Sequence, residues 1–292
     1  MAFAIVNGAR LAWQQLGDGP DLILVHGLGA NRAFWFAQAS ALAADFRVSL
    51  FDLRGHGYSE RTTSGYSASA LGADILGLMD ALGIDRAALA AHSHGGAAAL
   101  EAALAAPRRC TQLALFDARI PALQPHMRLL DAELTPYERH LAAISTARYG
   151  YDWAREDQVG LRFLEAAARL RSDGVDDGVR DAFTPFGEGR GAQRAARQWL
   201  QLLDGTALRN EVDRIGTRAD AIGRLAAPVL LMYARNSRCL PSGLALRERL
   251  PQARWVGIDA GHFFPLSHAA VVAAELRAFL QPTAHRAEAL CP

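Results

Sequence analysis

The chain alternates short apolar runs with segments in which apolar positions recur every three or four residues. Continuous apolar runs are typical of parallel strands covered on both faces, and the longer periodic segments are typical of the helices that cover them. Strand-like runs lie at 3–6, 10–16, 21–26, 47–52, 86–92, 112–117, 228–234 and 253–259. Helix-like segments lie at 31–44, 68–82, 95–106, 241–250 and 268–280. This alternation predicts an α/β fold, a three-layer sandwich around a mostly parallel eight-stranded sheet.

Residues 118–223 break the alternation. This stretch has no convincing strand, and its helical patterns lie at 137–149, 159–170 and 192–203. We therefore expect a core formed by residues 1–117 and 224–281, with a helical cap, or lid, inserted at 118–223. Residues 282–292 are expected to be a flexible tail.

Composition narrows the class of protein. Of the 292 residues, 51% are hydrophobic, which is enough for an extensive core. The net charge of +1 gives no reason to expect a nucleic acid or an anionic membrane as partner. No apolar run approaches the roughly 20 residues of a membrane span, and the N-terminus lacks a signal-peptide pattern. We expect a soluble, cytoplasmic protein, and the sequence indicates no particular oligomeric state.

Lysine and cysteine usage excludes several kinds of chemistry. The chain contains no lysine, so Schiff-base and phosphate-loop lysines are excluded. Its three cysteines, Cys110, Cys239 and Cys291, are an odd number at unrelated spacings. That pattern fits neither a disulfide framework nor a zinc site and favours a reducing compartment.

The stretch "RAALAAHSHGGAAALEAAL" (86–104) combines an apolar strand, a tight turn around Ser93 and an Ala-rich helix. This order is typical of a nucleophile elbow, in which a strained turn projects a serine hydroxyl above the sheet. Ala91 stands where the GxSxG pattern has its first glycine. The amide of His94, at the helix N-terminus, is placed to stabilise an oxyanion. The alternative is a chance serine in a strand-to-helix loop.

His92 and His94 have the spacing of a metal-binding HxH pair. One flanks the turn at a strand end and the other enters the helix, so their imidazoles should diverge, and no cluster of further ligands adjoins them. We therefore predict no metal site.

Two glycine-rich turns follow the next apolar strands. "HGLG" (26–29) comes directly after a buried run, and the amide of Leu28 would be a second oxyanion donor. In "FDLRGHGYSE" (51–60), Asp52 and Arg54 are expected to pin the loop rather than to perform chemistry.

Near the C-terminus, "AGHF" places His262 in a loop after the last strand. A lone histidine is usually structural, but a serine at an elbow followed by a late histidine is the chain order of one catalytic architecture. Together, "HGLG", "DLRGHGYS", "AHSHGG" and "AGHF" resemble the α/β-hydrolase superfamily over 1–117 and 224–281. The resemblance implies Ser93 as nucleophile, His262 as general base and the Leu28 and His94 amides as oxyanion hole. No cofactor is expected, because "GLGANR" lacks the GxGxxG spacing of a nucleotide site.

The third member of a serine triad, a carboxylate, is missing from its usual place in this superfamily. That place corresponds to the loop "YARNSRCLP" (233–241), which has no acidic residue. Asp117, at the end of the 112–117 run, would reach the same imidazole from a neighbouring strand end, and we predict that it is the triad acid.

Three alternatives to this assignment stay open. Asp117 could instead form an ion pair with Arg119 or cap a loop. Asp259 could be the acid, although it lies only three residues before His262. A neutral Asn236 or Ser237 could orient the imidazole. With Asp117 as the acid, Ser237→Ala is expected to change little.

A serine nucleophile forms an acyl-enzyme from an ester, thioester or lactone, and the acyl acceptor is water, an alcohol or an amine. The alternatives are a weakly active or inactive ligand-binding member of the fold, and a carbon–carbon bond hydrolase with the same triad. Aromatic side chains of the inserted segment suggest a small-molecule, largely apolar acyl substrate, free or carrier-bound. They are Tyr137, Tyr149, Tyr151, Trp153, Phe163, Phe183, Phe186 and Trp199.

Overall fold

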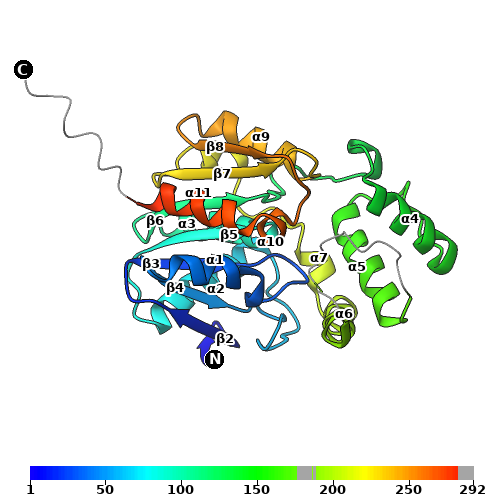
Figure 1. Ribbon diagram of the computed structural model, residues 1–292, viewed down its shortest axis with the longest axis horizontal. Coiled ribbons are helices and arrows are strands. Elements are labelled where there is room, and N and C mark those ends of the chain that lie inside the picture. The colour runs from blue at the N-terminus through cyan, green and yellow to red at the C-terminus, as the bar shows by residue number, and fades with distance from the viewer. Residues whose placement is uncertain (176–185, 187–188, 282–292) are drawn as a thin grey trace, which may run out of the picture.

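The computed structural model describes residues 1–175, 186 and 189–281, so the predicted tail (282–292) and Phe183 lie outside the described residues. One eight-stranded sheet with flanking helices forms the centre of the molecule (Figure 1). Its strands are β1 (Ala2–Val6), β2 (Ala9–Leu16), β3 (Asp21–Val25), β4 (Arg47–Phe51), β5 (Ala87–His92), β6 (Cys110–Phe116), β7 (Val229–Ala234) and β8 (Arg254–Ile258). The predicted fold class is confirmed.

The strand order is β1-β2-β4-β3-β5-β6-β7-β8. β1 and β2 form an antiparallel hairpin through Asn7 and Gly8, whose φ angles of 47° and 76° suit a tight two-residue turn. β2 is antiparallel to β4, and all later pairs are parallel. The C-terminal ends of β3, β5 and β6 therefore meet at one edge of the sheet.

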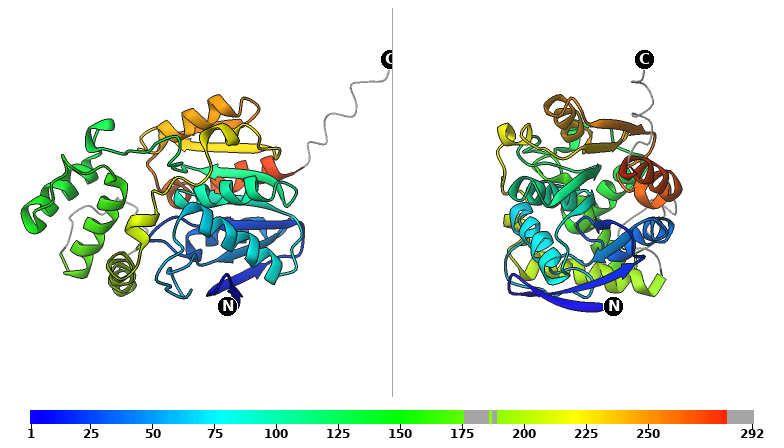
Figure 2. Two further views of the ribbon diagram at one scale, coloured as in Figure 1. Left: turned by 180° about the vertical axis from the view of Figure 1, so that it is seen from behind. Right: turned by 90° about the vertical axis from the view of Figure 1, so that its left-hand side faces the viewer.

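Helices cover both faces of the sheet, as Figure 2 shows from the side. One layer contains α1 (Phe36–Leu42) and α11 (Ala269–Leu280), and the other contains α2 (Ala68–Ala81), α3 (His94–Ala105) and α9 (Leu240–Arg249). Successive strand residues alternate between the two cores: Leu22 and Leu24 lie on one side, Ile23 and Val25 on the other. Both faces are thus buried, which explains the continuous apolar runs.

Between β6 and β7 the chain forms helices that lie beyond the strand ends, to the right in Figure 1. They are η2 (Leu129–Asp131), α4 (Pro136–Tyr149), α5 (Val159–Ser172), α6 (Gly189–Gly205) and α7 (Leu208–Glu211), and the short helix α8 (Ala219–Ile222) follows them on the way back to β7. The sequence sets the bounds of α4: Thr135 and Glu138 form a capping box at its start, and Gly150, with φ 68°, ends it. Within the described ranges, no helix is long and apolar enough to cross a bilayer.

Candidate active site

Ser93 sits on the turn between β5 and α3 with φ 57° and ψ −126°, a conformation that non-glycine residues rarely adopt. The turn packs so closely that its neighbours must be small. A Cβ at position 95 would lie 2.3 Å from the carbonyl oxygen of His26, and one at position 96 would lie 2.5 Å from the Cβ of Ala118. A side chain at either position would collide with these atoms, so Gly95 and Gly96 are needed for the strained turn to pack this closely.

The loop carrying Leu28 is fixed by two buried histidines that the sequence reasoning did not single out. His26 donates from Nδ1 to the Gly27 carbonyl (2.8 Å) and accepts from the Leu53 amide at Nε2 (3.0 Å). His56 Nε2 accepts from the Gly29 amide at 3.2 Å. Burial lowers the pKa of His26 to about 4 and that of His56 to about 3, so both rings are neutral and keep one acceptor nitrogen. The only sequence signal was their position beside glycines, in "HGLG" and "GHG".

The second glycine-rich turn is held by ion pairs, as expected. Arg54 makes a bidentate contact with Asp74 at 2.8 and 2.9 Å. Asp52 accepts from the backbone amide of Arg32 at 2.7 Å and from its guanidinium at 2.5 Å. These contacts hold Asp52 and Arg54 within the loop, and none of them involves Ser93.

The two proposed oxyanion donors lie on either side of Ser93. A Cβ at Gly27 would be 2.9 Å from the Ser93 Cβ, so the Leu28 loop approaches the serine closely. Leu28, Ser93 and His94 line the same cavity. Among the described residues, neither the Leu28 nor the His94 amide donates a backbone hydrogen bond.

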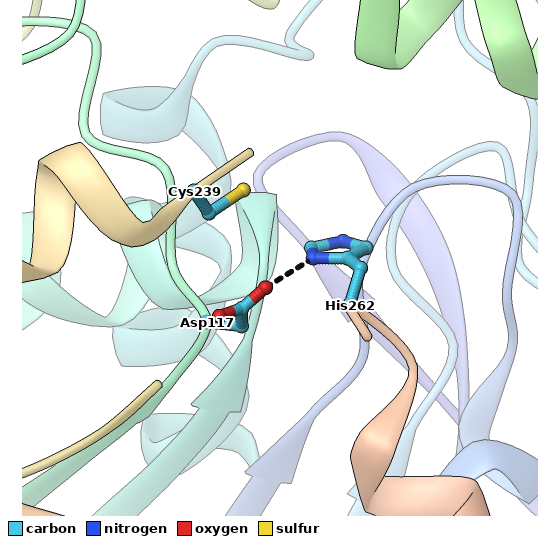
Figure 3. A group of neighbouring side chains, drawn as sticks. All are labelled: Asp117, Cys239 and His262. Carbon is cyan, nitrogen blue, oxygen red and sulfur yellow. Dashed lines mark hydrogen bonds and ion pairs between the residues drawn. The ribbon is translucent and has the colours of Figure 1, made fainter. Parts of the chain in front are cut away.

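His262 connects the serine to a carboxylate. Its Nε2 is 3.0 Å from the Ser93 hydroxyl oxygen, and its Nδ1 is 2.6 Å from Oδ2 of Asp117. Figure 3 shows the imidazole and the carboxylate pointing toward each other, from the loop after β8 and from the end of β6. These distances fall within hydrogen-bond reach, so the three residues expected to form the triad lie together.

Asp117 is completely buried and has a φ of 49°, which makes it the second strained non-glycine residue of the site. The Ala234 amide donates to Oδ1 at 3.0 Å, and the Ser237 hydroxyl makes a short hydrogen bond to Oδ2, the oxygen that faces His262. Hydrogen bonds to the charged form compensate for burial of a carboxylate. The loop 233–241 has no acidic residue of its own, but its Ala234 amide and Ser237 hydroxyl hold the carboxylate of Asp117, the residue after β6.

Two of the alternatives lack the contacts they require among the described residues. Arg119 pairs with Asp213 instead of Asp117. Asp259 is contacted by the Asn236 side chain at 3.4 Å, whereas the His262 ring is hydrogen-bonded to Asp117. Asp117 does hold the loop after β7, but it does so while it contacts His262.

Because Ser237 hydrogen-bonds Asp117, the expectation that Ser237→Ala changes little loses its basis. Ser237 acts on the imidazole through the carboxylate and does not replace it.

His92 and His94 point in different directions, which agrees with the argument against an HxH metal site. His92 donates from Nε2 to the backbone carbonyl of His262 at 2.9 Å, and its ring stacks on Phe34. His94 donates from Nε2 to the Tyr66 carbonyl at 3.1 Å. Burial lowers the pKa of both rings, so they act as neutral donors. His92 thereby supports the loop that carries His262.

The charge on His262 is stabilised by its neighbours. Burial disfavours the imidazolium, but the Cys239 sulfur and the Asp117 carboxylate outweigh burial and raise the pKa of His262 above its ordinary value. An imidazole whose protonated form is stabilised can accept the serine proton as the serine attacks.

A cavity of about 400 Å³ opens over Ser93. Its floor is formed by core residues and its walls by the helices between β6 and β7. The apolar residues contributed by these helices and their connections are Met127, Tyr137, Leu161, Phe163, Leu164, Ala167 and Val212. Of the aromatic residues singled out in the sequence, Tyr137 and Phe163 line the cavity, whereas Trp153, Phe186 and Trp199 are buried in the core.

Comparisons with known proteins agree with this architecture. The family described as alpha/beta hydrolase fold matches residues 20–269. The chain is 42% identical over 281 residues to the dihydrolipoyllysine-residue acetyltransferase component of the acetoin cleaving system of Pseudomonas putida, covering 95% of this chain and 68% of that protein. It is 36% identical over 272 residues to a protein of Azorhizobium caulinodans named as the carbamate hydrolase RutD, covering 89% and 91%. The solved structure of Est816, described as an N-acyl homoserine lactone degrading enzyme, shares its fold, with a TM-score of 0.70 at 19% identity and coverage of 96% and 100%.

Proposed function

The chain belongs to the alpha/beta hydrolase fold family, and on that premise we propose that it is a serine hydrolase that cleaves an ester or thioester through an acyl-enzyme. The observation that carries the proposal is the continuous chain of contacts from Ser93 through His262 to Asp117. A site without an acid would favour the alternative of an inactive binding protein. The buried, hydrogen-bonded carboxylate of Asp117 beside His262 favours the hydrolase instead.

The geometry supports the following steps. His262 Nε2 takes the proton of the Ser93 hydroxyl as its oxygen attacks the acyl carbon. The resulting oxyanion accepts hydrogen bonds from the Leu28 and His94 amides, while Asp117 stabilises the imidazolium. Collapse of the tetrahedral intermediate releases the alcohol or thiol, which takes the proton from His262. Water then attacks the acyl-enzyme by the same route and releases the acid.

The cavity suggests which acyl groups are accepted. Its volume of about 400 Å³ and its apolar walls suit a medium-sized acyl group, and the helices between β6 and β7 would act as its cap. Cofactor independence and a cytoplasmic location remain predictions from the sequence.

Acyl transfer to an acceptor other than water is a second candidate. It is favoured by the 42% identity to a protein named as an acetyltransferase component. Adding alcohols, amines or thiols to the assay distinguishes the two, because a transferase partitions its acyl-enzyme toward the added acceptor.

A panel of p-nitrophenyl esters and acyl thioesters of increasing chain length tests the proposal. We expect a burst of the first product from activated esters, because their acyl-enzyme forms faster than water hydrolyses it. Turnover should be highest for medium chains, and Ser93→Ala should abolish the burst. A fluorophosphonate should modify Ser93 in the wild type. If no ester or thioester is turned over and Ser93 of the folded protein stays unmodified, the proposed function is wrong.

A further inference from the structure

A third side chain, which takes no part in the proton transfers of the hydrolytic steps, lies beside the Asp117–His262 pair. The thiol of Cys239 comes from the residue just before α9 and lies near both groups (Figure 3). One ligand atom from each of Asp117, Cys239 and His262 lies within 4.8 Å of the other two. Among the described residues, this is the cluster of side chains able to hold a metal ion.

The three ligand types together select one class of ion. A thiolate, an imidazole and a carboxylate form a mixed set that Zn²⁺ accepts in protein sites, whereas Mg²⁺ and Ca²⁺ prefer oxygen ligands alone. Sequence spacing could not reveal this set, because the residues come from three separate segments: the residue after β6, the residue before α9 and the loop after β8. The spacing argument applied only to His92 and His94.

The distances fit after a small rearrangement. Tetrahedral coordination by S, N and O ligands separates the ligand atoms by roughly 3.3–3.6 Å. The 2.6 Å contact between Asp117 and His262 would have to open by about 0.7 Å. His262 can make this movement, because it lies on the loop between β8 and α10 (Phe264–Ser267) and its side chain is 28% exposed. Asp117 stays anchored by Ala234 and Ser237.

An ion can reach the cluster from solvent. Cys239 and His262 both line the cavity above Ser93. The open side of the ion would face this cavity, where water supplies the fourth ligand.

We propose that Asp117, Cys239 and His262 form an inhibitory site for a thiophilic divalent cation such as Zn²⁺ or Cd²⁺. Binding releases the proton of the Cys239 thiol, and the proton on His262 Nδ1 moves to Nε2 because the metal takes the Nδ1 lone pair. With Nε2 protonated, the ring no longer accepts the proton of Ser93, and Asp117 is withdrawn from the imidazole. Inhibition rests on the proposed function, whereas the metal site itself does not.

Metal binding is measured first, without any assay of activity. The protein is prepared with Cys291→Ala in every variant, so that the thiols tested are those of Cys110 and Cys239. Titration with Cd²⁺ is followed by the ultraviolet charge-transfer absorption of cadmium–thiolate bonds. We expect one equivalent to bind, and Cys239→Ala to abolish the absorption. Cys110→Ala is the matched control, because this second buried cysteine lies at the start of β6 away from the cluster and should leave the absorption unchanged.

Inhibition by Zn²⁺ is measured next, with reversal by EDTA. Loss of an outer-shell partner of a metal site costs about 10- to 100-fold in affinity, so loss of the thiolate ligand should raise the inhibitory Zn²⁺ concentration by at least about tenfold. Because the Cys239 sulfur also raises the pKa of His262, the uninhibited rate of Cys239→Ala is measured first, and inhibition of each variant is expressed relative to its own uninhibited rate. Absence of the cadmium–thiolate absorption, or equal inhibition of wild type and Cys239→Ala, would overturn the proposal. If the absorption appears in a protein without esterase activity, the metal site stands and the proposed function fails.

Discussion

At the scale of single residues, the site combines groups from two neighbouring strand ends. The residue after β6 supplies the carboxylate, and the loop after β7 supplies the groups that hold it. Asp117 accepts from the Ala234 amide and the Ser237 hydroxyl while it faces His262. The sequence indicated Asp117 because the loop 233–241 has no acidic residue. It did not indicate the role of Ser237, because only the pairing of β6 with β7 shows that this hydroxyl lies beside Asp117.

The pH dependence of the reaction tests this arrangement. Cys239 and Asp117 raise the pKa of His262, and the base acts only when neutral, so kcat/KM should rise with pH along a limb centred above the ordinary histidine value of 6.5. In Asp117→Asn, the negative charge of the carboxylate is gone, so the pKa of His262 falls and the limb should move to lower pH. The profiles are recorded with EDTA present. A limb that stays in place in Asp117→Asn, or moves equally in Asp259→Asn, contradicts the assignment.

At the scale of elements, α5 joins the wall of the cavity to the rest of the inserted segment. Phe163 and Ala167 of this helix line the cavity. Glu165 of the same helix is buried and forms three ion pairs, with Arg162 and Arg169 of α5 and with Arg209 of α7. Burial disfavours the Glu165 carboxylate, but the three guanidinium groups outweigh it and lower its pKa to about 2. The amphipathic period of α5 was readable from the sequence, whereas this link to the short helix α7 depends on tertiary packing.

Glu165→Gln is expected to lower the free energy of unfolding by about 3 kcal/mol, the lower end of the range for breaking a buried ion pair. The lower end applies because the three arginine side chains are each about a third exposed, so water can solvate them once the carboxylate is gone. The lowered pKa fixes the sign of the pH effect. The contribution is complete above the ordinary value of 4.5 and is lost as pH falls toward about 2. Urea unfolding midpoints of both proteins, measured across that range, should converge at the acid end.

The control for this experiment is Asp220→Asn, which removes an exposed partner of Arg218. It should leave the urea midpoint unchanged at every pH. A difference between Glu165→Gln and wild type that persists unchanged at the acid end would exclude ionic stabilisation by Glu165.

At the scale of the whole molecule, the fold was predictable because its signals are local. Each apolar run that we interpreted as a strand is one, and the three periodic segments at 137–149, 159–170 and 192–203 are helices. The short helices α7 and α8 have too few residues to show a period. His26 and His56 were missed because their neutral, buried state follows from packing between distant loops. Sequence order predicted which residues form the triad, whereas the contacts that support them depend on which strands are adjacent.

The central claim is that a carboxylate at the end of β6 supports the base that activates Ser93. It is tested by the acylation rate in single-turnover experiments with wild type, Asp117→Asn and Asp259→Asn, checked for folding by circular dichroism. Ser237→Ala, measured alongside them, should be slower than wild type by about 10- to 100-fold, because a hydrogen bond to a charged group is worth about 1.5–3 kcal/mol. Asp117→Asn should be slower by about 10² to 10⁴, while Asp259→Asn should match wild type. Near-normal acylation by folded Asp117→Asn, with loss of activity in Asp259→Asn, would contradict the account.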